Sequence, residues 1–446
     1  ARRYLELPPG FSLSIYAQDL PRARLLRFTE RGDLLVSGRH AGDIVLLTRD
    51  DDGDGQADDR RTVIAGLNRP QGMDFIGDWL YVAERDRVGR VRFDHDSGTV
   101  SGDYETVVAG LTGNGFHWSK TLRVGPDGML YLTQGSTCNV CEEDDPRRAT
   151  MMRFAADGSD AEIIATGLRN SVGFDWAPWD GSLYATENGR DLLGDNFPPC
   201  ELNLIETGRF YGWPYFNGDN VPDPDMDADP LAAERSPVPP VHEFRAHNAP
   251  LGIGFVDSRD WPGDFERVAL VALHGSWNRS VPDGYKVVSL HFGADGIEER
   301  SFLDGFNRDG KILGRPVDVL QGPDGAVYIS DDYAAAIYRV APGDSADSPM
   351  TSVPEPPPQA GGNQDWLATA DLGAMSQAGS ALYRQHNCRS CHEDGENPRS
   401  LAGLAQRLDY AGVIEVLRAP RAPMPLLALS EQQRRELAVY LLATHP

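Results

Sequence analysis

A short pattern recurs along most of the chain: a tight turn of Asp or Gly leads at once into an apolar, β-rich run. It occurs at residues 32–36, 77–82, 127–132, 180–184 and 324–329. Such turns join antiparallel strands, so each run is expected to be a strand that follows a hairpin. The matching leucines of the first four runs are Leu35, Leu80, Leu130 and Leu183. Their intervals of 45, 50 and 53 residues match the length of a four-stranded propeller blade.

The interval from Leu183 to the next occurrence, at Val327, is 144 residues, nearly three blades. The apolar run at 268–271 supplies a strand for the fifth blade, and a Pro- and Asp-rich insertion lies before it, around 221–240. Helical periodicity is nearly absent before residue 370, and a β-sandwich would need shorter and more even spacing. The sequence therefore predicts an all-β six-bladed β-propeller.

A different motif dominates the C-terminal end. The sequence Cys388-Arg389-Ser390-Cys391-His392 has the C-x-x-C-H pattern of covalent haem attachment, in which two thioethers hold the porphyrin. Residues 375–387 have helical composition, and Ser430 is placed to cap a closing helix. We therefore expect a small all-α cytochrome c domain that carries haem c on Cys388 and Cys391, with His392 as an axial iron ligand.

A methionine flanked by prolines, Met424, lies between these two helical segments. The order of haem motif, methionine and closing helix resembles a class I cytochrome c. The resemblance implies that Met424 is the second axial ligand of the haem iron. His386, two residues before Cys388, is expected to be a surface residue of the preceding helix.

Composition divides the chain into three parts. Proline, glycine and serine are concentrated after the last predicted strand, as in Val353-Pro354-Glu355-Pro356-Pro357-Pro358, and such a segment favours an extended tether. We expect the propeller at 1–341, a Pro/Gly-rich linker at 342–366 and the cytochrome c domain at 367–446.

The charge of the chain limits its partners. The 42 Lys and Arg residues against 67 Asp and Glu give a net charge of −25, and this field repels nucleic acids and anionic lipids. We expect no nucleic-acid partner, and no run approaches the roughly 20 apolar residues of a membrane span. The chain reads as a mature soluble protein that has lost its export signal. Because haem c is attached on the export side, we expect a periplasmic or secreted bacterial protein.

Several segments of the propeller region carry a second resemblance. They include Phe116-His117-Trp118-Ser119, Gly167-Leu168-Arg169-Asn170, Thr186-Glu187-Asn188-Gly189-Arg190, His274-Gly275-Ser276-Trp277-Asn278-Arg279 and Gly314-Arg315-Pro316. Together they resemble the soluble pyrroloquinoline quinone (PQQ)-dependent sugar dehydrogenases of the glucose, sorbosone and pyranose dehydrogenase type. A redox cofactor is needed between a two-electron oxidation and a one-electron haem, and no Gly-rich dinucleotide fingerprint is present.

The resemblance implies roles for individual residues. His117 would be the general base that takes the proton of the sugar C1 hydroxyl while hydride passes to PQQ, and Arg169 would stabilise charge on the quinone oxygens. His247 and His274 remain alternative bases. The implied PQQ contacts are Arg169, Asn170, Trp277, Asn278, Arg279 and Arg315. Arginine suits a cofactor with three carboxylates, because its planar fork pairs with them bidentately.

Calcium is implied beside the quinone, held by the backbone carbonyls of Gly189 and Arg190. The chain departs from the glucose dehydrogenase pattern here, which has Gly-Pro at these two positions. A separate loop with Asp50, Asp52, Asp54 and Asp58 matches a calcium loop at positions 1, 3, 5 and 9. Its twelfth position is Arg61 instead of Glu, so the alternatives are a structural calcium site and a solvated acidic turn.

Three cysteines lie outside the haem motif: Cys138, Cys141 and Cys200. In an oxidising compartment we expect one disulfide, either between Cys138 and Cys141 or from one of them to Cys200. One thiol should therefore remain reduced.

The resulting hypothesis is PQQ-dependent oxidation of an aldose, pyranose or sorbosone-like sugar at C1. Electrons would pass to haem c and then to an external acceptor such as another cytochrome or a quinone. Two alternatives remain: a calcium-dependent propeller hydrolase such as a lactonase, and a non-catalytic electron-transfer or sugar-binding module.

Overall fold

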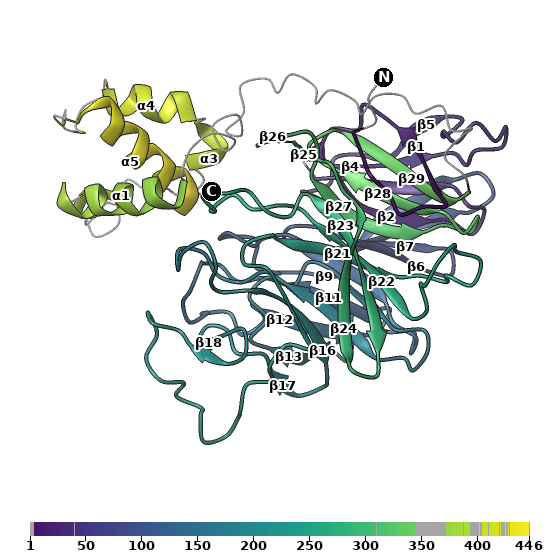
Figure 1. Cartoon of the computed structure of the whole chain (residues 1–446), viewed down its shortest axis with the longest axis horizontal. Helices are drawn as coiled ribbons and strands as arrows, with labels where there is room; N and C mark the ends of the chain where they lie inside the picture. Colours follow the sequence, from purple (N-terminus) through teal and green to yellow (C-terminus); the bar gives the residue numbers. More distant parts are fainter. Residues whose placement is uncertain are drawn as a thin grey trace. The chain divides into compact units, whose positions relative to one another are not determined.

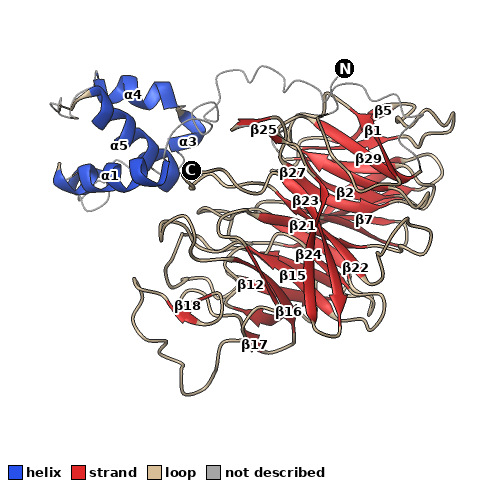
Figure 2. Ribbon diagram, in the orientation of Figure 1, coloured by secondary structure: helices blue, strands red, loops and turns tan. Residues whose placement is uncertain are grey.

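The computed structural model describes residues 4–39, 41–308, 310–343, 372–386, 388–392, 401, 404–408, 410–418, 420, 424, 427 and 429–445. These residues form two compact units. Figure 2 shows that the described strands belong to one unit and the described helices to the other. The predicted linker at 342–366 lies almost wholly outside the described residues, so its boundaries stay a prediction.

The described strands form six blades in chain order (Figure 1). Blade 1 contains β2 (Ala23–Phe28), β3 (Leu34–Gly38), β4 (Asp43–Leu47) and β5 (Arg60–Ile64). Blade 2 contains β6 (Met73–Ile76), β7 (Trp79–Ala83), β8 (Val88–Asp94) and β9 (Thr99–Val108). Blade 3 contains β10 (Lys120–Val124), β11 (Leu130–Gln134), β12 (Thr150–Phe154) and β13 (Glu162–Thr166), extended by β17 (Arg209–Phe210).

The second half of the propeller repeats this plan. Blade 4 contains β14 (Phe174–Trp176), β15 (Leu183–Glu187), β16 (Cys200–Ile205) and β20 (His242–Phe244). Blade 5 contains β21 (Pro250–Phe255), β22 (Val268–Leu273), β23 (Lys286–Gly293) and β24 (Gly296–Leu303). Blade 6 contains β27 (Pro316–Gln321), β28 (Val327–Asp331), β29 (Ala336–Pro342) and β1 (Phe11–Ala17). Two short hairpins, β18 (Phe216–Asn217) with β19 (Val221–Pro222) and β25 (Asn307–Arg308) with β26 (Lys311–Ile312), complete the described strands.

The recurring leucines explain the blades. Leu35, Leu80 and Leu130 lie in the second strands of blades 1 to 3 and are fully buried. Leu35 and Leu80 pack in one apolar cluster, which joins neighbouring blades. The six-bladed propeller predicted from this repeat is confirmed.

The first strand of each blade lies at the centre of the propeller. Residues of β2, β6, β10, β14, β21 and β27 together line one cavity of about 20 Å³. Aspartates of the inner strands join these strands across blade boundaries: Asp74 accepts from the Val124 amide at 2.8 Å, and Asp175 accepts from the Phe255 amide at 2.9 Å. Each carboxylate therefore satisfies a backbone donor of the next blade.

The N-terminal strand closes the ring. β1 pairs antiparallel with β29, with Ser12 opposite Ala341 and Ser14 opposite Arg339. The first described strand thus becomes the outer strand of the last blade. Closure of this kind leaves no open boundary between blades 6 and 1.

Inner and second strands are antiparallel, so the start of one meets the end of the other at the same edge of the propeller. Lys120 lies opposite Gln134 in blade 3, and Pro316 lies opposite Asp331 in blade 6. Loops that enter inner strands and loops that leave second strands therefore share this edge, which we call the entry edge.

The second unit contains α1 (Leu372–Gln385), α2 (Arg389–His392), α3 (Leu404–Arg407), α4 (Tyr410–Arg418) and α5 (Glu431–Thr444). Gly379 allows α1 to approach α5, because a Cβ there would meet the Glu436 carbonyl. The predicted cap is present: Ser430 and Gln433 form a reciprocal capping box at the start of α5. Among the described residues, no helix is long and apolar enough to cross a bilayer.

Candidate functional site

Each blade carries at least one arginine or histidine in the segment that leads into its inner strand. In blade order, the residues closest in sequence to the inner strand are Arg22, Arg69, His117, Arg169, His247 and Arg315. They lie at the entry edge, and they concentrate basic groups within a chain of net charge −25. Arg22 and Arg69 belong to none of the motifs that the sequence analysis used. An alignment of the blade repeats would have found Arg69, since Arg69-Pro70 matches Arg315-Pro316.

Arg169 is buried and held by oxygen atoms. Its guanidinium donates to the Asn139 carbonyl and side-chain oxygen, both at 2.9 Å, and to the Asn188 and Gly189 carbonyls, both at 3.1 Å. The Gly189 carbonyl, which the sequence predicts to bind calcium, therefore faces a cationic group here. The Arg190 side chain binds elsewhere, in a buried ion pair with Asp223 at 2.7 Å.

A disulfide closes the loop that presents Asn139. Cys138 and Cys141 are bonded, with their Cα atoms 6.2 Å apart. Of the two pairings open from sequence, this one is confirmed. Cys200 is the remaining thiol; it is buried, and burial raises its pKa to about 11. A thiol protonated at neutral pH is unreactive.

His117 is held by the same loop. Its Nδ1 lies 2.8 Å from the Ser136 hydroxyl, which donates to the Cys138 carbonyl at 2.7 Å. A hydroxyl has one proton to donate, so His117 Nδ1 must be the donor to Ser136. The lone pair of the neutral imidazole therefore stands on Nε2, as a general base requires.

The surroundings also keep His117 neutral. Burial, followed by the charges of Arg169 and Arg148, holds the pKa of His117 well below its usual value. Arg148 is itself buried and donates to the carbonyls of His117 and Ser136 at 3.2 and 2.9 Å. The structure therefore brings the predicted base and the predicted cationic residue, Arg169, together at the entry edge.

His274, one alternative base, lies in another polar group. Its Nε2 is 2.9 Å from Asp332, which also pairs with Arg24 at 3.0 Å. Burial and Arg315 lower the pKa of His274 to about 4, although Asp332 acts in the opposite direction. Arg315 itself donates to the carbonyls of His274 and Gly275 at 3.0 and 2.6 Å.

Asn170 leads into blade 4 beside a buried carboxyl group. Its amide donates to Glu187, whose pKa burial raises to about 8. Glu187 lies opposite Glu201 in the β15–β16 ladder, and burial raises the pKa of Glu201 to about 7. Two buried carboxyl groups thus lie beside the Asn188–Gly189 turn.

The other predicted PQQ contacts lie in the segment 277–282. Trp277 is half-buried, Asn278 donates to Asp191 at 2.8 Å, and Arg279 donates to Asn196 at 3.4 Å. This segment and the segment 191–197 therefore bind each other. The roles of Trp277, Asn278 and Arg279 toward PQQ stay predictions.

The haem motif lies in the helical unit. Cys388 and Met424 pack, half-buried, against an apolar cluster that includes Leu382, Tyr383 and Leu437. The His392 amide donates to the Cys388 carbonyl at 3.1 Å, so the motif makes a helical turn. The Cys391 side chain and residues 393–400 lie outside the described residues. An apolar cradle lined by the motif and by Met424 fits a porphyrin.

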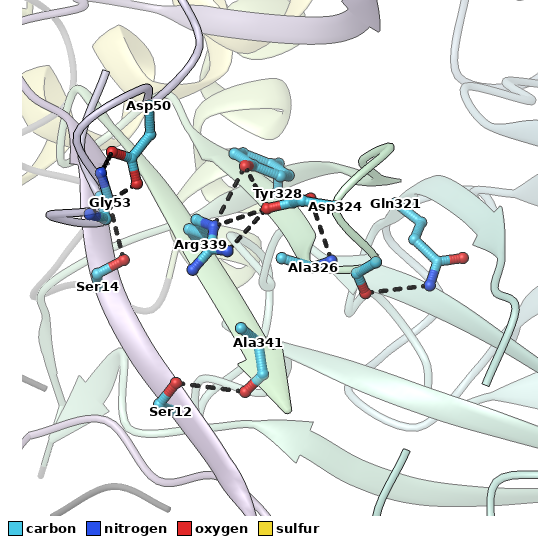
Figure 3. A network of polar contacts seen from close by, with 12 residues as sticks. Ser12, Ser14, Asp50, Gly53, Gln321, Asp324, Ala326, Tyr328, Arg339 and Ala341 are labelled. Carbon is cyan, nitrogen blue, oxygen red and sulfur yellow. Dashed lines mark hydrogen bonds and ion pairs between the residues drawn. The ribbon is translucent and has the colours of Figure 1, made fainter. Parts of the chain in front are cut away.

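The acidic loop is closed by hydrogen bonds from its own backbone amides (Figure 3). Asp50 accepts from the amides of Gly53 at 2.7 Å and Gly55 at 2.8 Å, and carboxylate oxygens of Asp50, Asp52 and Asp54 lie within 4.8 Å of one another. Ser14 of β1 donates to the Gly55 carbonyl at 3.0 Å. Asp58 lies beside this cluster and accepts from the Asp51 amide at 3.3 Å.

Known proteins match both units. The TrAA12-like family profile matches residues 5–198 and 220–342, and the profile described as cytochrome C oxidase, cbb3-type, subunit III matches residues 374–441. An uncharacterized protein of Borreliella burgdorferi is 31% identical over 75% of this chain and 90% of its own length. A PQQ-dependent pyranose dehydrogenase of Coprinopsis cinerea is 24% identical over 64% of this chain, which spans less than half of that relative, 45%.

A solved structure supports the fold. The calcium structure of the Trichoderma reesei carbohydrate-active enzyme of family AA12 aligns with a TM-score of 0.67 and 22% identity, over 76% of this chain and 97% of that one. The resemblance that the sequence motifs carry, a PQQ-dependent dehydrogenase propeller joined to a cytochrome c domain, is confirmed. The chain belongs to the TrAA12-like family.

Proposed function

We propose that the chain is a PQQ-dependent sugar dehydrogenase that oxidises an aldose, a pyranose or a sorbosone-like sugar at C1 and passes the electrons through haem c to an external acceptor. The observation that carries the proposal is the neutral His117, with its Nε2 lone pair available, beside Arg169 at the entry edge. The family and its PQQ-dependent relative support the cofactor. The cytochrome match supports the electron route.

The residues of the entry edge fit a tricarboxylate quinone. Among the described residues, the guanidinium of Arg315 pairs with carbonyls and with no carboxylate. The Arg24 Nε atom and the Asn248 side-chain oxygen are buried there without a partner in the described part of the chain. PQQ, when bound, supplies a two-electron acceptor for hydride. We propose Arg169, Asn170 and Arg315 as residues that hold it. The PQQ contacts of Trp277, Asn278 and Arg279, in the segment 277–282, stay predictions from the resemblance.

In this proposal His117 Nε2 takes the proton of the C1 hydroxyl, and its Nδ1–H remains bound to Ser136. Arg169 stabilises negative charge that develops close to the base, because the Asn139 carbonyl and side-chain oxygen hold its guanidinium in place. Burial of both groups strengthens this effect. His274 is the rival base, since Asp332 orients it.

Calcium is proposed at two places. The first place is the Gly189 carbonyl with the Arg190 carbonyl that follows it. A hard cation there would take the Gly189 oxygen from the Arg169 guanidinium, to which it is now bonded. Asp50, Asp52 and Asp54 gather in the second place, with Asp58 beside them. There the role is structural, because the loop is tied to β1. The relative solved with calcium supports a calcium requirement.

For the electron route we propose haem c on Cys388 and Cys391, with His392 and Met424 as the axial ligands. Because this haem is attached after export, we propose that the protein acts in the periplasm or is secreted. The external acceptor would be a cytochrome or a quinone.

The test is the visible spectrum of the haem-loaded chain, reconstituted with PQQ and calcium, while aldoses, ketoses and osones are added. We expect haem reduction only when PQQ and a sugar are both present. His117→Gln should slow reduction about 10²- to 10⁴-fold, and His274→Gln, its matched control, should slow it far less. The reverse order of the two variants would assign the base to His274.

Two other results would reject the proposal. Hydrolysis of a lactone without any electron acceptor would identify a propeller hydrolase. A haem that stays oxidised with every sugar, although PQQ is bound, would identify a binding or electron-transfer module.

A further inference from the structure

Two arginines from different blades flank one tryptophan at the entry edge. The guanidinium carbon of Arg39 lies 4.9 Å from the centre of the Trp118 ring, and that of Arg69 lies 4.8 Å from it. Arg39 follows β3 in blade 1, Arg69 leads into β6 in blade 2, and Trp118 leads into β10 in blade 3. Three successive blades therefore build this cluster.

The cluster carries positive charge that the described part of the chain does not neutralise. Neither Arg39 nor Arg69 forms an ion pair with a described carboxylate, and the Nε atom of Arg39 is buried without a partner there. The carboxylate that acts on Arg39 is that of Asp332, which already pairs with Arg24 and with His274. In a chain with 67 acidic residues against 42 basic ones, unpaired arginines in one place point to a missing anion.

Other groups around the cluster strengthen the positive field. Arg22 and Arg24 act on Arg39, and Arg85 acts on Arg69. Contact with an aromatic ring attracts a cation. That attraction leaves the charge in place, so it does not replace a counter-ion.

We propose that Arg39, Trp118 and Arg69 form a binding site for an organic carboxylate. A guanidinium binds a carboxylate through two parallel hydrogen bonds, and contact with the Trp118 ring holds both guanidinium groups in place. Trp118 follows His117 in the chain, so the cluster and the proposed base share the segment that leads into β10. The inference rests on the proposed function: the carboxylate is that of an acidic sugar, such as a uronic acid, bound as the substrate.

Titration calorimetry on the haem-loaded, PQQ-free chain tests the site without turnover. The probes are PQQ, D-galacturonate and D-galactose, where the two sugars differ only in a carboxylate or a hydroxymethyl group at C6. The variants are Arg39→Gln and Arg69→Gln. The matched control is Arg92→Gln, which removes an exposed guanidinium 4.0 Å from the Trp79 ring in blade 2. Thermal melting confirms that each variant is folded.

We expect the control to match the unaltered chain, and we expect each test variant to weaken the binding of galacturonate at least 10-fold. A loss of preference for galacturonate over galactose, with PQQ affinity kept, supports the site for an acidic substrate. A 10-fold loss of PQQ affinity instead would show that the arginines hold the cofactor and would overturn the proposal. Unchanged binding of both probes in folded variants overturns the proposal. Should these binding effects appear while no sugar reduces the haem, only the proposed function fails.

Discussion

The chain contains two Cys-x-x-Cys sequences with different surroundings. In the propeller, Cys138 and Cys141 form a disulfide, and the loop between them presents Asn139 to Arg169. In the helical unit, Cys388 and Cys391 are followed at once by His392, and the motif lies against an apolar cluster. The spacing of the two cysteines is the same in both motifs. The residues between and after the cysteines decide the chemistry.

The comparison separates two functions that a redox protein needs. The propeller motif positions charge and a proton acceptor, since Ser136 links His117 to the Cys138 carbonyl. The C-terminal motif is suited to attach a cofactor. Breaking either one should therefore remove a different capability and leave the other intact.

The largest effect is expected from Cys388→Ala/Cys391→Ala, because covalent haem attachment needs both thioethers. The variant should contain no covalently bound haem in a denaturing gel stained for haem. Sugar oxidation by the PQQ-loaded variant with a soluble dye as acceptor should remain within about 3-fold. Loss of dye-linked activity as well would show that the two motifs do not act separately.

The second largest effect is expected from Cys138→Ser/Cys141→Ser. The loop is short, so its chain-entropy contribution is only about 2 kcal/mol, and the variant should fold. Asn139 would no longer hold Arg169 through two hydrogen bonds. We expect kcat/KM with the dye acceptor to fall about 10- to 100-fold, with haem content unchanged.

Asn139→Ala is the partner variant, because it keeps the disulfide and removes the side-chain acceptor for Arg169. Its kcat/KM with the dye acceptor should also fall, but by a smaller factor than in the disulfide-free variant. Normal kcat/KM in a folded, disulfide-free variant would show that the loop does not position Arg169.

The sequence could predict the repeat of the blades, but it could not predict the pairing of β1 with β29 that closes the ring. The leucines in the second strands of blades 1 to 3 recur because each is fully buried, so their spacing is visible in the chain. β1 carries no mark of its partner, and its pairing with β29 depends on contacts across more than 300 residues. A pattern of local residues cannot identify so distant a neighbour.

The site was predictable only where a motif carried it. His117, Arg169 and Arg315 lie in short segments that resemble a family. Arg39 and Arg69 lie in no such segment. They stand out because they have no described carboxylate partner and contact one tryptophan, and only the coordinates reveal this. The pairing of Cys138 with Cys141 likewise depended on distance.

The pH dependence offers a sharper test of the comparison. His117 must be neutral to act as a base, and its pKa is lowered, so the activity is kept until the pH falls to that lowered value. We expect the acid limb of kcat/KM to lie below pH 6.5, the ordinary value for histidine. In Cys138→Ser/Cys141→Ser, Arg169 should move away from His117. The acid limb should then shift to higher pH, because a nearby cation favours the neutral imidazole. In Cys388→Ala/Cys391→Ala the limb should not move. An identical limb in all three proteins would remove Arg169 from the surroundings of His117.

The smallest effect is expected from Ser136→Ala, which removes the acceptor for the His117 Nδ1–H and with it the preference for the tautomer that leaves Nε2 free. One neutral hydrogen bond contributes about 1 kcal/mol, so kcat/KM should fall about 5-fold. Ser37→Ala is the matched control. Both serines are fully buried, but the Ser37 hydroxyl bonds only to the backbone of Leu25 in β2. The two variants should lose similar stability in urea, while only Ser136→Ala lowers kcat/KM. Equal losses of activity would mean that Ser136 supports the fold of the loop and does not orient the base.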